Sequence, residues 1–176
     1  YLPAVGGSGG GQFKAPCEEG QLLAGFELRV GDDVDAIRPL CAVAIEPGRT
    51  SDPKATGQDW HGGAGGAVQR LVCPQKTPVV IGIDVVSEGA TEVVNSIHLF
   101  CGQVVATQVA DPYPSAILDA SGYTDGRGLM APFSSIGGGS MRCPQDQVAI
   151  GVHGRSGKWL DAMGLICGVP VIPKPP

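Results

Sequence analysis

The chain has 176 residues, a net charge of −5 and only 16% charged residues, a length that suits one compact domain. Its Lys and Arg are scattered singly, so we expect no surface for nucleic acid or anionic lipid. No apolar run approaches the roughly 20 residues of a membrane-spanning helix, and no signal peptide is recognisable at the start. The 28 Gly and 15 Pro favour many short strands joined by turns over long helices.

Six cysteines divide the chain into three similar units. Cys17 and Cys41, Cys73 and Cys101, and Cys143 and Cys167 bracket segments of similar length. Each bracket contains a Gly and a following apolar residue near its start: Gly25-Phe26, Gly82-Ile83 and Gly151-Val152. Each also contains an Asp or Asn six positions before its second Cys, and an apolar residue two positions further on: Asp35 and Ile37, Asn95 and Ile97, Asp161 and Met163.

A glycine cluster precedes each bracket: residues 6–10, 62–66 and 137–139. Together these coincidences predict a three-fold internal repeat. We expect repeat units at roughly 6–44, 62–104 and 136–169 within a single domain of residues 1–176, followed by a Pro-rich tail at 170–176.

In chain order, the first unit reads as a β-hairpin. An apolar strand at 22–30 is followed by turn residues Gly31-Asp32-Asp33 and a second strand at 34–44. The long connection 102–136 is expected to hold some strand and an exposed loop. The third unit repeats the hairpin, with strands at 147–154 and 159–169 around a turn near 156–157.

The cysteine pattern predicts one disulfide within each unit. A hairpin brings its two ends together, so the first and second Cys of each bracket can meet. No C-x-x-C pair occurs, which excludes the usual zinc and thioredoxin spacings. Disulfides imply an oxidising compartment, so we expect a secreted or periplasmic protein.

One hairpin cannot bury its own apolar face, whereas three can share an axis. The expected fold is therefore all-β, a disulfide-stapled β-prism of three sheets. The G-G-x-G-G cluster and the G-x-x-x-D tip followed by Ala-Ile or Ala-Met resemble the jacalin-related lectins, over roughly residues 6–168. That resemblance implies Greek-key sheets with pseudo-three-fold symmetry. A pair of cysteines in every unit is not typical of plant jacalins and is more similar to the pattern of the vitelline-membrane outer-layer proteins.

The resemblance also implies two sugar sites, in each of which a G-x-x-x-D tip faces a glycine-rich loop. The first combines Gly157, Lys158, Trp159, Leu160 and Asp161 with the loop 6–10, chiefly Gly9 and Gly10. The second combines Gly31, Asp32, Asp33, Val34 and Asp35 with Gly62 and Gly63, near Trp60 and His61. In such sites the carboxylate accepts hydrogen bonds from sugar hydroxyls, and glycine lets the backbone approach closely.

The site with Trp159 is the stronger candidate, because an aromatic ring suits the apolar face of a sugar. The three Asp at 32, 33 and 35 could instead suit a cation. The middle tip, residues 91–95, lacks both the Gly and the Asp, so we expect it to be inactive or altered. A simpler interpretation of both tips also stands, in which Gly supplies a positive φ and Asp bonds to its own turn.

The sequence thus leaves two functions open. The first is an extracellular lectin that binds carbohydrate or glycoconjugates. The second is a structural coat or matrix module without sugar binding, in either case with possible self-association or a larger parent protein. His61, His98 and His153 have no metal-ligand spacing, and no paired acid and base or nucleophile motif occurs, so we expect no enzyme, no cofactor and no metal site.

Overall fold

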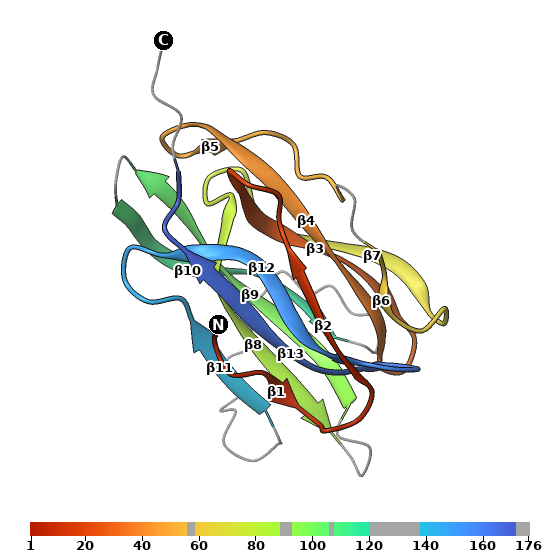
Figure 1. The fold of residues 1–176 in the computed structure, drawn as a ribbon. Coiled ribbons are helices and arrows are strands. Elements are labelled where there is room, and N and C mark those ends of the chain that lie inside the picture. The colour runs from red at the N-terminus through yellow and green to blue at the C-terminus, as the bar shows by residue number, and fades with distance from the viewer. Residues whose placement is uncertain (56–58, 89–92, 106–107, 120–137, 172–176) are drawn as a thin grey trace.

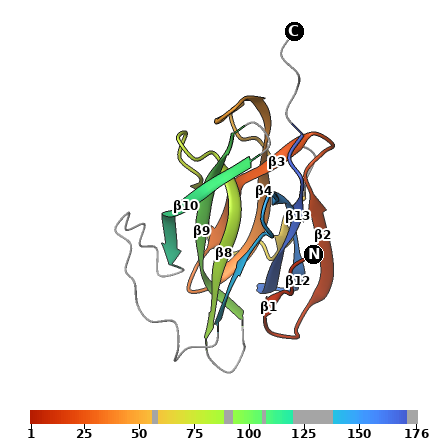
Figure 2. The ribbon, with the colours of Figure 1, turned by 90° about the vertical axis from the view of Figure 1, so that its left-hand side faces the viewer.

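The computed structural model describes residues 1–55, 59–88, 93–105, 108–119 and 138–171, and its regular structure is all β-strand (Figure 1). The described residues contain no helix of the length and apolar character that crossing a membrane would need. Figures 1 and 2 show three long hairpins, one from each repeat unit, running side by side.

The strands form three antiparallel sheets. The first, in spatial order, contains β1 (Val5–Gly6), β13 (Leu160–Gly168), β12 (Val148–Ser156) and β2 (Gly11–Pro16). The second contains β5 (Arg49–Thr50), β4 (Val34–Glu46), β3 (Gln21–Val30) and β7 (Ala67–Val72), with β6 (His61–Gly62) also paired to β4. The third contains β10 (Gln108–Asp119), β9 (Val93–Val105), β8 (Val79–Glu88) and β11 (Gly138–Arg142).

Each sheet is built from parts of two units. The hairpin of one unit is completed by the strand that precedes the first Cys of the next unit, so β7 pairs with β3 and β11 with β8. The start of the chain closes the circle, because β2 pairs with β12 of the last unit. The repeat units therefore do not coincide with the sheets, and this exchange links the three hairpins into one body.

The repeated glycines mark the same irregularity in every sheet. The strand register shifts immediately before Gly25, Gly82 and Gly151. At each shift the bulged residue offers its carbonyl to the backbone N–H of the next unit's first Cys, as Ala24 does to Cys73 over 2.9 Å. A bulge bends the strand and increases its twist, which helps the flat hairpins to curve around the core.

The core lies between the sheets, and the three units contribute equivalent residues to it. The apolar residues that follow the repeated Gly and Asp or Asn are fully buried, and they come from all three hairpins: Phe26, Ile83, Val152, Ile37, Ile97 and Met163. Burial of this apolar surface is the main force that holds the three sheets together.

The predicted disulfides are confirmed. Cys17 pairs with Cys41, Cys73 with Cys101 and Cys143 with Cys167, with Cα–Cα distances of 5.8, 5.7 and 5.6 Å. Each closes the open end of its hairpin, at the end remote from the tip.

The third sheet, which is built on the hairpin of the middle unit and is called the middle sheet from here on, departs from the symmetry. In the other two sheets the outer edge beside the tip is a two-residue strand, β1 or β6. In the middle sheet this edge is taken by the 12-residue strand β10, which pairs with Ser96 close to the tip. The connection 102–136 thus contains the expected strand, while its residues 106–107 and 120–136 lie outside the described residues, as do 89–92 of the middle tip, Gly137 and residues 172–176 of the tail.

Candidate functional site

The first predicted site, which we call site one, consists of the tip 157–161 and the loop 6–10. The backbone N–H of Gly7 donates a hydrogen bond of 2.8 Å to the carbonyl oxygen of Asp161, which docks the loop on the tip. A Cβ at either Gly9 or Gly10 would lie within 3.0 Å of the Asp161 carboxylate. Only glycine lets the loop backbone come this close, and Gly10 also has a φ of +59°, which favours glycine.

The carboxylate of Asp161 is held in an unusual state. Its residue is only 9% exposed, and Oδ2 has no hydrogen-bond partner among the described residues. Burial raises the pKa of Asp161, while the charge of Arg155 and a hydrogen bond from the Gly157 amide act in the opposite direction. A buried acceptor without a partner is costly, so a hydroxyl donor that reached this oxygen would form a favourable hydrogen bond.

The other side chains of the site one tip differ in their burial. Trp159 is half-buried, and the Lys158 ammonium lies 4.6 Å from the centre of its ring. Leu160 is fully buried in the core, so its side chain does not face the site. The tip itself is closed by a hydrogen bond of 2.9 Å from the Gly157 amide to the Trp159 carbonyl.

The second predicted site, site two, consists of the tip 31–35 and the loop 62–66, and it repeats this geometry. The Gly63 N–H donates a hydrogen bond of 2.9 Å to the Asp35 carbonyl, and the Gly31 N–H donates one of 3.0 Å to the Asp33 carbonyl. Val34, like Leu160, is fully buried. The two sites are therefore built on one plan, from different units.

Two residues of site two were missed by the sequence prediction, which named Gly62 and Gly63. A Cβ at Gly65 or Gly66 would lie within 3.0 Å of the Asp35 carboxylate, whereas Gly62 packs on the backbone of Asp35 and Ala36. Aligning the cluster 62–66 on 6–10 would have found them, since Gly65 and Gly66 then match Gly9 and Gly10.

Asp33 of site two is engaged by the middle unit. The Asn95 side-chain amide donates a hydrogen bond of 2.6 Å to Oδ1 of Asp33. Burial raises the pKa of Asp33, and the negative charges of Asp32 and Asp35 add to that effect. Within the described ranges, no group of three His, Cys, Asp or Glu is arranged to hold a metal ion.

The altered middle unit thus contributes to a neighbouring site. Asn95 occupies the sequence position of Asp35 and Asp161, but its side chain links two tips. We expected a changed middle tip, and its Thr91 and Glu92 lie outside the described residues.

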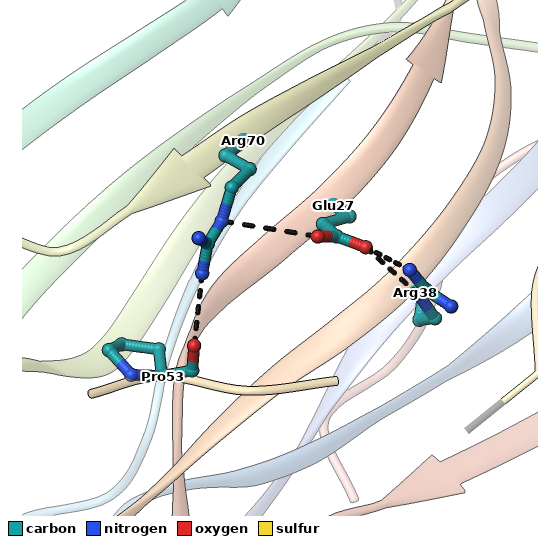
Figure 3. A network of polar contacts seen from close by, with 4 residues as sticks. All are labelled: Glu27, Arg38, Pro53 and Arg70. Carbon is teal, nitrogen blue, oxygen red and sulfur yellow. Dashed lines mark hydrogen bonds and ion pairs between the residues drawn. The ribbon is translucent and has the colours of Figure 1, made fainter. Parts of the chain in front are cut away.

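A polar network supports site two from the outer face of its sheet. Figure 3 shows Glu27 between Arg38, which donates two hydrogen bonds to it, and Arg70, whose Nε lies 4.0 Å away. Arg70 also donates a hydrogen bond of 2.9 Å to the Pro53 carbonyl, which links Pro53 to β7 (Figure 3). The Arg38 guanidinium lies 4.8 Å from the ring centre of Trp60, near the start of the loop.

His61 anchors the same loop to the first sheet. Its ring stacks on Phe13, with 4.3 Å between ring centres and 10° between planes. Burial lowers the pKa of His61, against the opposing charge of Asp59. Trp60 and His61 thus lie beside the loop and hold it in place, Trp60 through cation–π contacts with Arg29 and Arg38 and His61 through stacking on Phe13.

Comparison with solved structures identifies the fold. The artocarpin–mannotriose complex matches with a TM-score of 0.58 and 15% identity over 96% of each chain. A mannose-binding jacalin-related lectin from Ananas comosus matches with a TM-score of 0.55 and 21% identity, over 97% of this chain and 96% of that chain. Malaysian banana lectin matches with a TM-score of 0.56 and 16% identity over 96% of each chain.

No protein-family model matches the sequence. A comparison with curated protein sequences likewise finds no match. The likeness is therefore one of fold across almost the whole chain, at low sequence identity. The chain has the β-prism fold of the jacalin-related lectins, as its sequence motifs predicted.

Proposed function

We propose that this chain is an extracellular lectin, a single β-prism domain that binds mannose-type sugars at site one and site two. The observation that carries the proposal is the Asp161 carboxylate, whose Oδ2 has no partner in the described structure. Its Oδ1 lies against Gly9 and its Oδ2 against Gly10, neither of which has a side chain. The sugar class is taken from two structurally similar proteins, the mannose-binding lectin from Ananas comosus and artocarpin in its complex with mannotriose.

In the proposed binding mode, Asp161 accepts hydrogen bonds from two sugar hydroxyls. Hydrogen bonds to an ionised acceptor are stronger than those between neutral groups, which suits a small, well-hydrated ligand. Backbone amides of the loop and the tip then donate to the sugar oxygens, since Leu160 and Val34 are buried and can contribute only backbone groups. Trp159 offers apolar surface at the edge of site one.

We infer binding without turnover. The tip 157–161 and the loop 6–10 together contain one carboxylate, Asp161. Most glycoside hydrolases use two carboxyl groups on either side of the scissile bond, an arrangement that site one does not offer. The three disulfides support secretion, because such bonds persist in oxidising compartments.

Titration with methyl mannoside and mannotriose tests the proposal, with backbone amide NMR signals assigned to each site. We expect shifts at Gly9 and Gly10 for site one and at Gly65 and Gly66 for site two. The double variant Asp161→Asn with Asp35→Asn should lose both sets of shifts while it keeps its fold. Absence of binding by the wild-type chain, to these sugars and to a glycan array, would refute the lectin function.

The alternative is a structural coat or matrix module, which the regular disulfide stapling would suit. In that case the two tips would be turns only. Ordered self-assembly at native concentration without glycan, together with no sugar binding, would favour this alternative over the lectin.

A further inference from the structure

Two arginines occupy the same place in the repeat. Arg155 follows the repeated Gly151 by four positions, and Arg29 follows Gly25 by four. Both pair across the sheet with the alanine that comes directly after the site carboxylate, Ala162 or Ala36. The corresponding residue of the middle unit is Val86, which pairs with Ser96.

Arg155 contacts the loop of site one through two parallel hydrogen bonds. Its Nε donates to the Gly9 carbonyl and its Nη2 to the Gly10 carbonyl, each over 2.7 Å. A planar guanidinium with two engaged donors fixes the orientation of its acceptors as well as their distance. These are the two residues whose backbone lies against the Asp161 carboxylate.

The glycine loop needs such support. Glycine loses more conformational freedom on ordering than any other residue, so an unsupported loop would sample many conformations. Gly9 and Gly10 are exposed and bring no side chain of their own to anchor them. Ordering the loop before the sugar arrives reduces the entropy lost on binding.

Arg29 makes the corresponding contact in site two, but less tightly. Its Nη1 donates to the Ala64 carbonyl over 3.3 Å, and its guanidinium lies 4.8 Å from the Trp60 ring centre. The loop of site two has additional anchors in His61 and the Glu27 network. The loop of site one is held by the two hydrogen bonds from Arg155. The middle unit has Val86 in place of the arginine, and its tip also lacks the G-x-x-x-D pattern.

We infer that Arg155 is the positioning residue of site one and Arg29 its counterpart in site two, each holding the glycine-rich loop in the sugar-binding conformation. This inference rests on the proposed function for its ligand. Arg155 is also the charged neighbour that favours ionisation of Asp161, opposite to the effect of burial. It thus acts on both halves of the site, the loop and the carboxylate.

Two substitutions separate these contributions. Arg155→Met keeps the aliphatic stem but removes the donors and the charge, whereas Arg155→Lys keeps the charge and loses the planar fork. Arg49→Met serves as the control, because Arg49 is an exposed residue whose ion pair is with Glu46. For each variant we would measure the NMR pKa of the Asp161 carboxyl group without sugar, and mannose affinity at site one between pH 3.5 and pH 8.

We expect Arg155→Met to weaken mannose binding at site one about tenfold, to raise the pKa of Asp161 further and to move the acid limb of the binding profile to higher pH. Arg155→Lys should weaken binding without that shift. Hydrogen exchange at the Gly9 and Gly10 amides should become faster in both variants. Arg29→Met should affect only site two, and by less.

A purely structural role for Arg155 would change thermal stability but leave the pH profile of binding where it is. Unchanged affinity, loop exchange and Asp161 pKa in Arg155→Met would overturn the inference while the wild-type chain still bound mannose. If the wild-type chain did not bind sugar, the proposed function would fall, and the pKa and exchange measurements would still decide whether Arg155 holds the loop.

Discussion

The carbonyl oxygen of Lys158, in the tip of site one, lies against Gly63, in the loop of site two. A Cβ at Gly63 would lie within 3.0 Å of that oxygen. The two sites are therefore in direct backbone contact, although their residues are far apart in the sequence. The third glycine cluster also packs near the first, although through a side chain: Gly139 lies against the side chain of Val5, the residue just before the loop 6–10. The tips and loops thus interlock at one end of the prism.

This contact predicts that one substitution disturbs both sites. Gly63→Ala places a methyl group against the Lys158 carbonyl, so the loop, the tip or both must shift. We expect weaker mannose binding at site one and at site two, seen in site-resolved NMR titrations. Gly11→Ala is the matched control, because its Cβ would have as its nearest neighbour the Ser156 carbonyl at 4.0 Å. Normal affinity at site one in Gly63→Ala would show that the sites are mechanically independent.

Substitutions further along each loop should affect one site alone. Gly9→Ala places its Cβ on the Asp161 carboxylate, and Gly65→Ala does the same at Asp35. We expect Gly9→Ala to abolish binding at site one and spare site two, with the reverse for Gly65→Ala. Calorimetry should then report half the number of bound sugars per chain in either variant. A full complement of binding sites in both would show that these loops do not contact the sugar.

Much of this architecture could be predicted because a few residues with specific structural roles recur at corresponding positions in the units. The cysteines and the bulge glycines recur in all three units and the tip aspartate recurs in two, so the three copies remain recognisable. The strand exchange could not be predicted in the same way. β2 and β7 are edge strands with one buried residue each, and so they carry little of the alternation that identifies a sheet partner.

The site contacts that were missed are long-range. Asn95 and Asp33 are 62 positions apart and meet only because the tips converge at one end of the prism. Likewise, nothing in the local sequence of Arg155 indicates that its guanidinium reaches Gly9 and Gly10. The local motif therefore identified the carboxylates, while the residues that hold the loops over them depend on the assembled prism. The division into units at 6–44, 62–104 and 136–169 stays a prediction.

The disulfides predict similar losses of stability in the three units. Replacing Cys73 and Cys101 together by Ala opens a loop of 28 residues, and the corresponding loops in the other units have 24. The loop-entropy model gives a loss of about 3 kcal/mol for each pair. Guanidinium unfolding of the three double variants should therefore give comparable losses. A negligible loss in any of them would show that packing alone closes that hairpin.

Asp161 should make the folded protein less stable, as a consequence of its placement for binding. Its folded-state pKa lies above the ordinary value of 3.8 because the ionised form is buried. The folded state consequently binds the proton more tightly than the unfolded state, and stability falls as pH rises from 3.8 through the raised pKa. At neutral pH the full penalty of the buried charge is present.

Asp161→Asn should therefore abolish mannose binding at site one and at the same time raise the melting temperature at pH 7. The Asn side chain carries no buried charge, so the gain should disappear below pH 3.8, where the wild-type carboxyl group is also neutral. Differential scanning calorimetry at several pH values measures this difference. Asp52→Asn makes the same change of charge at an exposed position and should give no comparable gain. A lower melting temperature for Asp161→Asn at pH 7 would mean that the carboxylate stabilises the tip, and the unpartnered oxygen would then have a structural role.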